Sequence, residues 1–453
     1  MKKIAAIFKN KEVMNRIVFT LAILFVFRLG SSITIPGVTV NDVSFSDDSI
    51  FALMNLLGGG ALSSFSIFAL GVSPYITAGI IIQLLSMDVL PALSELNKQG
   101  QTGRRKSEMA TRYLTLLLGA VQAYGIIVTM ENSNYVTLSG SGFWNYAYLV
   151  TILVAGGMLV MWLGDKITTN GIGNGISVII FAGIVSSLPT QMFTAYQTWL
   201  YYPLLSGVPS NIINGLLLFG LYVISYIVII CFVTFIELSK RKIPVQHSGK
   251  SGSAKMASAS FLPIKINSAS VIPVIFASSI MMAPSVIASF ITGADTNAEW
   301  LNIFSTTKMT TMPWFNDKTW QMPWGLIIYL ILIVAFTFFY SNLQINPEQM
   351  ADNFQKNGSY IPGIRPGNET ERYVRKVLNR VTFIGAAALV FIAALPVVLT
   401  LTGLMSQSLA LGGTGLIIVV GVALELNSQI DGLLAGKSFE ESASASRSAR
   451  KGY

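Results

Sequence analysis

The sequence predicts an all-α, polytopic membrane protein with ten transmembrane helices. Hydrophobic residues make up 52% of the chain and charged residues only 11%, whereas about a quarter of the residues in soluble domains are charged. The apolar residues gather in runs, most of them close to the roughly 20 residues that a helix needs to cross a bilayer. These ten runs cover residues 17–35, 66–85, 111–130, 146–164, 175–188, 212–236, 271–291, 325–345, 377–400 and 412–429, the fifth being the shortest.

The basic residues predict how the chain is oriented. The sequence holds 30 Lys and Arg residues and a net charge of +9. If the amino terminus is cytoplasmic, ten crossings return the carboxyl terminus to the cytoplasm; only Lys308 and Lys318 then lie in outer loops, and Arg28 lies inside the first run. Cytoplasmic loops of membrane proteins carry an excess of Lys and Arg. We therefore expect both termini in the cytoplasm, and the positive charge indicates topology, not nucleic-acid binding.

The ten runs divide into two sets of five. Because five is odd, two halves built on one plan must be inverted relative to each other, as in many transport proteins. We expect an amino-terminal half at 1–190 with five helices, an external hinge loop at 191–211, and a carboxyl-terminal half at 212–453 with five more. The segment 191–211 has no charged residue. An ordinary connecting loop is an equally good interpretation of it.

Three inner segments, at 87–110, 238–269 and 346–376, are larger than connectors require, and each carries several basic residues. The tendency of basic loops to stay in the cytoplasm explains such a loop without any further role. The third segment adds a specific signal, because Arg365 lies between two Pro-Gly pairs. Such pairs favour tight turns. Arg365 is therefore expected at a stiff tip, where it could bind a protein or ribonucleoprotein partner.

One outer segment, residues 51–64 (FALMNLLGGGALSS), is apolar but too short to cross the membrane. Backbone at membrane depth must line a cavity or be covered by protein. The length predicts a re-entrant or buried half-helix, and the three glycines predict a mobile joint to the next span. A helix lying at the membrane interface fits the segment equally well.

The residue types needed for catalysis are scarce. The chain has one histidine and one cysteine, and GIGNGI at 171–176 lacks the GxGxxG spacing of a dinucleotide site. We expect no enzyme activity, no cofactor and no metal site. Ion-coupled carriers usually place acidic residues deep in the membrane, and the apolar runs hold few. A secondary transporter for a small solute is the alternative from another functional class.

Five motifs resemble one known family. They are residues 66–85 (SIFALGVSPYITAGIIIQLL), 100–106 (GQTGRRK), 170–184 (NGIGNGISVIIFAGI), 271–279 (VIPVIFASS) and 360–367 (YIPGIRPG). They resemble the bacterial SecY family of protein-conducting channels, and the resemblance runs nearly from end to end. It implies two five-helix halves around an hourglass pore, through which unfolded polypeptides cross the membrane. It also implies a lateral gate that releases transmembrane segments into lipid.

The resemblance assigns residues to the parts of that channel. A ring of aliphatic side chains, which would block hydrated ions by dewetting, is implied at Val72, Ile76, Ile172, Ile176, Ile275 and Ile418. The first four form two i,i+4 pairs, so each pair is expected to share a helix face, although an aliphatic residue at helical spacing normally faces lipid or another helix. A plug is implied at 51–64, with Phe51, Met54, Leu57, Gly58, Gly59 and Gly60. Thr77 and Gln83 are expected to hold the lateral gate closed.

The resemblance also implies partners. The motor ATPase SecA or the ribosome would dock on Arg104, Arg105, Lys106, Arg241, Lys242 and Arg365. SecE would clamp the two halves, often with SecG, and the ligands would be signal peptides, unfolded preproteins and membrane lipids of a bacterial plasma membrane. Residues 248–260 are rich in Ser, Gly and Ala and depart from the family by having fewer basic residues, which predicts weaker docking there. An accessory SecY dedicated to a few surface glycoproteins is the alternative within the family.

Overall fold

The computed structural model describes two compact parts of the chain. The described residues are 7–8, 10–41, 55, 58–86, 101–132, 135–138, 140, 142–206, 208–247, 260–291, 303–306, 309, 322–401 and 415–435. The first unit comprises Met1–Tyr202, Ala283–Ala298 and Ile418–Tyr453, and the second comprises Pro203–Met282 and Glu299–Ile417. Within the described residues, eight helices are long and apolar enough to cross a membrane. The predicted all-α membrane fold is therefore confirmed, while the predicted span at 66–85 corresponds to a shorter apolar helix.

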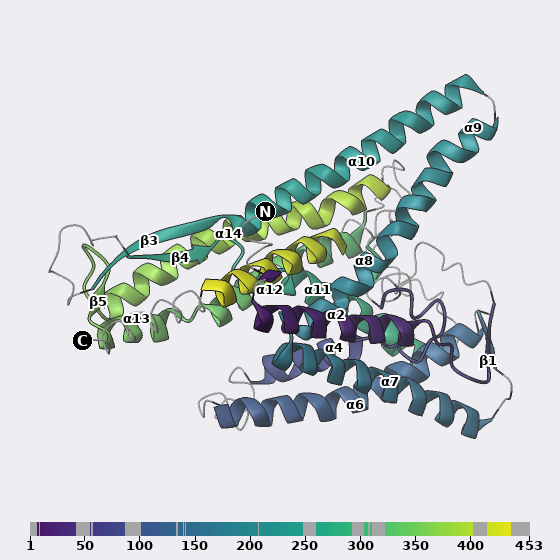
Figure 1. Ribbon diagram of the computed structural model, residues 1–453, viewed down its shortest axis with the longest axis horizontal. Helices are drawn as coiled ribbons and strands as arrows, with labels where there is room; N and C mark the ends of the chain where they lie inside the picture. The colour runs from purple at the N-terminus through teal and green to yellow at the C-terminus, as the bar shows by residue number, and fades with distance from the viewer. Residues whose placement is uncertain are drawn as a thin grey trace, which may run out of the picture. The chain divides into compact units, whose positions relative to one another are not determined.

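The first unit is built from long helices that pack side by side (Figure 1). They are α2 (Lys11–Ser31), α4 (Ser73–Leu85), α6 (Gln101–Asn132), α7 (Phe143–Asn170) and α8 (Gly175–Tyr196), joined by most of a last helix, Gly415–Ala435. A two-stranded antiparallel ribbon connects the ends of these helices, with β1 (Val38–Val40) opposite β2 (Val136–Leu138).

Helix α4 is shorter than the run that predicted it. The apolar run begins at Ser66, but the helix begins at Ser73, so the predicted span 66–85 is wrong over its first seven positions. Gly71 has φ +53°, outside the helical region, and Pro74 occupies the first turn of the helix, where its missing N–H costs nothing. Thirteen residues rise about 20 Å, less than the roughly 30 Å hydrocarbon core.

Helix α8 is longer than predicted. Its path continues through a π-helical turn, η1 (Gln197–Tyr201), and α9 (Tyr202–Ser206). Together they give a candidate span of 31 residues, Gly175–Leu205, so the shortest apolar run belongs to a helix long enough to cross a membrane. Most of the segment expected as a hinge loop, 191–211, is helical. The sequence between Gly183 and Gly207 holds no glycine to end the helix, and Pro189 is accommodated inside it.

The second unit combines helices with a small antiparallel sheet. Its helices are α10 (Pro209–Leu238), the first part of α11 (Ile272–Ile291), α12 (Trp324–Gln344), α13 (Pro347–Lys356) and α14 (Asn368–Leu401). The sheet has the order β4–β3–β5, with strands Ser260–Lys265, Lys240–His247 and Ser359–Tyr360. The sheet lies beside α13 and α14 (Figure 1). The two regions predicted as docking loops therefore contain regular structure.

A separate small core holds the sheet to α14. It consists of six buried aliphatic side chains, Ile243, Ile264, Ile361, Val374, Leu378 and Val381. Burial of aliphatic side chains stabilises such a cluster by about 1.5–3 kcal/mol each. The cluster explains why the segments 238–269 and 346–376 fold together, although they lie about a hundred residues apart in the sequence.

Candidate functional site

Residues 58–72 form a turn-rich, buried segment in the first unit. Leu62 and Phe65 are almost fully buried, and the Phe68 ring stacks on Phe27 of α2 with centroids 5.9 Å apart. Backbone hydrogen bonds tie the segment to the residues after α2, with the Ile35 amide donating to the Phe65 carbonyl at 3.2 Å. The segment is therefore packed on the end of α2.

The structure describes Asn55 and residues 58–64 of the predicted plug, and residues 58–60 form its glycine turn. Gly59 and Gly60 have φ values of +68° and +86°, which favour glycine. The Asn55 carbonyl accepts from the Gly60 amide at 2.8 Å, and the Asn55 side chain accepts from the Ser63 amide at 2.8 Å. Phe51, Met54 and Leu57 lie outside the described residues.

An arginine from α2 reaches the glycine turn. The Arg28 guanidinium donates to the Gly59 carbonyl at 2.5 Å and to the Ser186 hydroxyl of α8 at 3.3 Å. A Cβ on Gly59 would lie 2.8 Å from the Cα of Gly183, also on α8. The turn is thus packed against α8 at backbone distance and bonded to α2 through one cationic side chain.

The predicted ring residues are buried or half-buried within their own units. Val72, Ile76, Ile172 and Ile418 belong to the first unit and Ile275 to the second; all five are 9% exposed or less. Val72 is the N-cap of α4 and its carbonyl accepts from the Ile76 amide at 3.1 Å, so this pair keeps its i,i+4 relation.

The prediction that Ile172 and Ile176 share a helix face is wrong. Helix α8 begins at Gly175, so Ile172 precedes it, in a turn where Gly173 has φ +89°. Ile176 is half-buried, and its side chain packs beside Gly164 of α7, 3.1 Å from where a Cβ on that glycine would lie. The role of these residues in a ring stays a prediction.

Side chains from two other helices hold the turn that carries Ile172. The Ile172 amide donates to the Thr20 hydroxyl of α2 at 3.1 Å, and the Gly173 amide donates to the Gln429 side chain of the last helix at 2.8 Å. Asn174 caps α8 by accepting from the Ile176 amide at 3.2 Å. The glycine-rich motif therefore fixes a helix start and binds side-chain oxygens with its amides.

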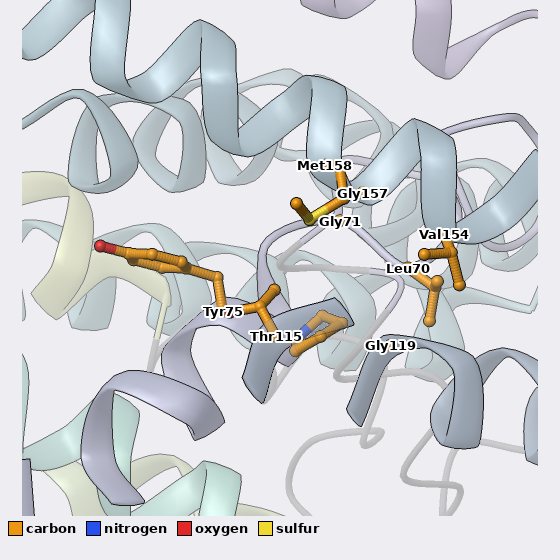
Figure 2. Close-up of a pocket in the computed structure, with 9 residues that line it drawn as sticks. Leu70, Gly71, Tyr75, Thr115, Gly119, Val154, Gly157 and Met158 are labelled. Atoms are coloured by element: carbon orange, nitrogen blue, oxygen red, sulfur yellow. The ribbon is translucent and has the colours of Figure 1, made fainter. Parts of the chain in front are cut away.

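The two predicted gate residues lie on α4. The Thr77 hydroxyl donates to the Ser73 carbonyl of its own helix at 3.1 Å, and the Gln83 side chain is half-buried. A small, mainly apolar hollow lies between α4, α6 and α7, and Figure 2 shows the Tyr75 hydroxyl directed away from Leu70 and Val154. A gate role for Thr77 and Gln83 stays a prediction.

The predicted docking residues are exposed wherever their side chains are described. Arg241 and Lys242 lie on β3, and Arg105 and Lys106 lie in the first turns of α6; the Arg104 side chain lies outside the described residues. Within the described residues, no three His, Cys, Asp or Glu side chains are grouped so that they could hold a metal ion.

The Arg365 turn is built on the small core of the second unit. Ile361 is buried in that core, and the Tyr360 hydroxyl donates to the Gln246 side chain of β3 at 3.0 Å. Gly363 and Gly367 have φ values of +83° and +102°. The Thr370 hydroxyl of α14 donates to the Arg365 carbonyl at 2.9 Å, while the Arg365 side chain is exposed. The backbone is fixed and the guanidinium faces outward, as the sequence predicts.

These features define the class of protein as a multi-pass helical membrane protein. Its second unit carries a basic platform, defined as the sheet β3–β5 together with the Arg365 turn. The SecY family profile matches residues 66–427. The protein translocase subunit SecY of Lactococcus lactis subsp. lactis (strain IL1403) is 42% identical over 442 residues, which cover 97% of each chain. The chain belongs to the SecY family.

Solved structures share this fold. One, described as the structure of a protein conducting channel, superposes with a TM-score of 0.64 at 19% identity and covers 93% of this chain and 92% of its own. Another, described as Sec61 in the canine ribosome-channel complex from the endoplasmic reticulum, gives a TM-score of 0.62 at 19% identity, with the same coverage. At this identity the likeness shows the fold alone.

Proposed function

We propose that the chain is the channel-forming subunit of a Sec-type protein translocase. It passes unfolded polypeptides across the membrane and releases transmembrane segments through a lateral gate into lipid. One observation carries the proposal above all: a relative named as a translocase subunit is 42% identical over 97% of both chains. Such identity over the whole length, together with the channel fold of the solved neighbours, supports a shared function.

The parts of the chain take distinct roles in this proposal. Val72, Ile76, Ile172, Ile176, Ile275 and Ile418 close the waist of the pore. Residues 51–64 act as the plug, 191–211 as the hinge, and Thr77 with Gln83 as part of the gate. The burial of the aliphatic set and the seating of the glycine turn between α2 and α8 support these roles. The channel itself is passive and catalyses no reaction.

The partners follow from the same proposal. SecE clamps the two halves, SecG accompanies them, and SecA or the ribosome docks on the basic residues of α6, β3 and the Arg365 turn. The exposure of Arg365 on a fixed backbone supports such docking, and the solved Sec61 neighbour is described in a complex with a ribosome. The distribution of Lys and Arg supports a plasma-membrane topology with both termini cytoplasmic.

The proposal is tested by reconstitution. The chain, co-expressed with SecE and SecG, is placed in liposomes with SecA and ATP, and the measurement is the amount of a secretory preprotein protected from added protease. We expect protection that requires ATP and the signal peptide. If the Lactococcus lactis subunit, prepared in the same way, protects the preprotein and this chain does not, the proposed function is wrong.

A further inference from the structure

Arg28 is a charged side chain within the apolar run that forms α2. It lies in the last turn of the helix. A cation there interacts favourably with the helix dipole, which is a sufficient reason for a basic residue at this position. The dipole does not explain why the guanidinium bonds to Gly59, 31 positions further along the chain, and to Ser186, 158 positions further. Ionisable residues inside membrane spans are costly and usually have a specific partner.

The contacts of Arg28 join three elements of the first unit. The guanidinium is 2.5 Å from the Gly59 carbonyl oxygen and 3.3 Å from the Ser186 hydroxyl oxygen. The Ser186 hydroxyl donates its own proton to the Gly183 carbonyl at 2.8 Å. Its oxygen lone pairs therefore remain available as acceptors for Arg28. One side chain of α2 thus holds both the glycine turn and α8.

The glycine turn is shaped to present its carbonyl to Arg28. Gly59 has φ +68°, and any side chain at this position would meet the backbone of Gly183. Asn55 closes the turn from the other side by bonding the amides of Gly60 and Ser63. The turn can therefore sit against α8 as one preformed unit, and Arg28 provides the cationic bond that keeps it there.

We infer that Arg28 is a latch that holds the glycine turn against α8, and that breaking this latch is a step in opening the channel. The inference rests on the proposed function, in which residues 51–64 form the plug. If the turn leaves, the guanidinium, whose residue is exposed, exchanges its bond to the Gly59 carbonyl for bonds to water.

The position of the turn is measured by thiol labelling. Cys231 is the single cysteine of the chain and is replaced by serine; Ala61, which is 0% exposed, is replaced by cysteine. In membranes, an impermeant maleimide added from outside should label Ala61→Cys slowly. Arg28→Met, which keeps a long side chain without a donor, should raise the labelling rate about ten- to hundred-fold, since a hydrogen bond to a charged group is lost. Arg16→Gln is the control, because it removes a cation from the same helix away from the turn.

A second variant disturbs the same contact by changing the glycine turn instead of Arg28. Gly59→Ala strains the turn and pushes it from Gly183, so it should also speed labelling. The double variant with Arg28→Met should label no faster than the faster single variant, because both break one contact. Arg28→Lys keeps the charge but loses the planar guanidinium, and it should give an intermediate labelling rate. If the Arg28→Met protein fails to accumulate in the membrane, the labelling rate of Arg28→Lys is used in its place.

The outcomes separate the latch from the proposed function. Labelling that stays slow in the Arg28 variants overturns the latch, whatever the chain transports. Additive effects of Arg28→Met and Gly59→Ala also overturn it. Fast labelling with a raised resting conductance in planar bilayers supports both the latch and the plug. Fast labelling without ion leak supports the latch and contradicts the plug role of the segment.

Discussion

At the scale of single residues, glycine is required in the 171–175 motif because its positions leave no room for a side chain or have a positive φ. A Cβ on Gly175 would overlap the carbonyl oxygen of Gly164, so α7 and α8 touch at backbone distance. Gly173 is held at φ +89° while its amide bonds Gln429. The sequence already excluded a dinucleotide site here by the spacing of the glycines. It could not show which backbone the glycines approach, because that depends on how the helices pack.

Gly175→Ala should destabilise the first unit. The new methyl group forces α7 and α8 apart, and overpacking of this kind costs about 1–3 kcal/mol. The measurement is the melting temperature of the purified protein in mild detergent, which should fall by several degrees. Gly220→Ala is the matched control, because nothing lies within 4 Å of a Cβ at that position of α10. Equal melting of the two variants would contradict the close contact.

Ile76→Asn and Ile275→Asn should each let ions leak through the resting channel. A polar amide at an aliphatic constriction lowers the barrier that dewetting imposes on hydrated ions. The measurement is the conductance of the reconstituted channel in planar bilayers without a preprotein. Exposed Ile224→Asn on α10 is the control for an added amide in an apolar helix. If both ring variants stay as silent as the unaltered chain, these residues do not form the waist.

At the scale of elements, the apolar runs predicted most of the long helices but not all of their ends. The run 212–236 became α10 at Pro209–Leu238, because little inside it interrupts a helix. The run 66–85 failed at its start, where Gly71 and Pro74 set the beginning of α4. Hydropathy measures whether a segment can be buried, and it does not distinguish a buried turn from a buried helix. Backbone signals decide between them.

The sheet in the second unit was missed for a related reason. The count of Lys and Arg in 238–269 indicated only a cytoplasmic loop. Along β3, however, Lys242 and Pro244 are exposed while Ile243 and Val245 are buried. This alternation of period two is a strand signal, and it could have predicted the hairpin. The pairing of β3 with β5 depends on contacts between distant segments, which a single sequence does not reveal.

A buried polar contact lies between the end of α10 and the segment that joins β4 to α11. Asn267 donates to the carboxylate of Glu237 at 2.7 Å and to the Ser270 carbonyl at 3.0 Å, and both Asn267 and Glu237 are buried. Ser270 has φ +54°, unusual for a residue with a side chain. The contact joins the end of α10 to the residues just before α11. The side-chain amide of Asn267 therefore helps to hold the end of α10 against the residues before α11.

Asn267→Leu should destabilise the second unit by about 1–3 kcal/mol, because the buried Glu237 side chain and the Ser270 carbonyl each lose a hydrogen bond. The melting temperature in detergent measures the effect. Asn342→Leu is the control, since that exposed amide bonds only to a carbonyl of its own helix among the described contacts. Equal melting of Asn267→Leu and Asn342→Leu would contradict this account.

At the scale of the whole molecule, the sequence predicted the membrane class and the family, while the candidate site was only partly accessible. Arg365 was found from its own neighbours in the sequence, because two Pro-Gly pairs shape the turn locally. Arg28 was noted only as a cation inside a run. Its contacts with Gly59 and Ser186 join residues far apart in the chain. Local signals thus predict sites within one loop, and sites assembled from several helices require the fold.

Arg365→Glu should leave the protein folded but inactive. The Thr370 bond to the Arg365 carbonyl and the burial of Ile361 do not involve the guanidinium, so the turn should keep its shape. Reversing the exposed charge replaces attraction to an acidic partner surface with repulsion. We expect normal assembly with SecE and a loss of SecA-driven translocation of about ten-fold or more.

Two further variants test whether the loss of activity comes from the charge of the platform or from the planar guanidinium of Arg365. Arg365→Lys keeps the cation but not the planar fork, so it should recover activity only in part. Lys356→Glu makes the same charge reversal on an exposed residue of α13 and should cost much less. The measurement is preprotein protected in proteoliposomes, divided by the amount of each variant in the membrane. If Arg365→Glu and Lys356→Glu lose activity equally, the effect is one of general charge and Arg365 is not a specific contact. If the activity of Arg365→Glu falls only in proportion to its amount, the residue acts on folding instead of docking.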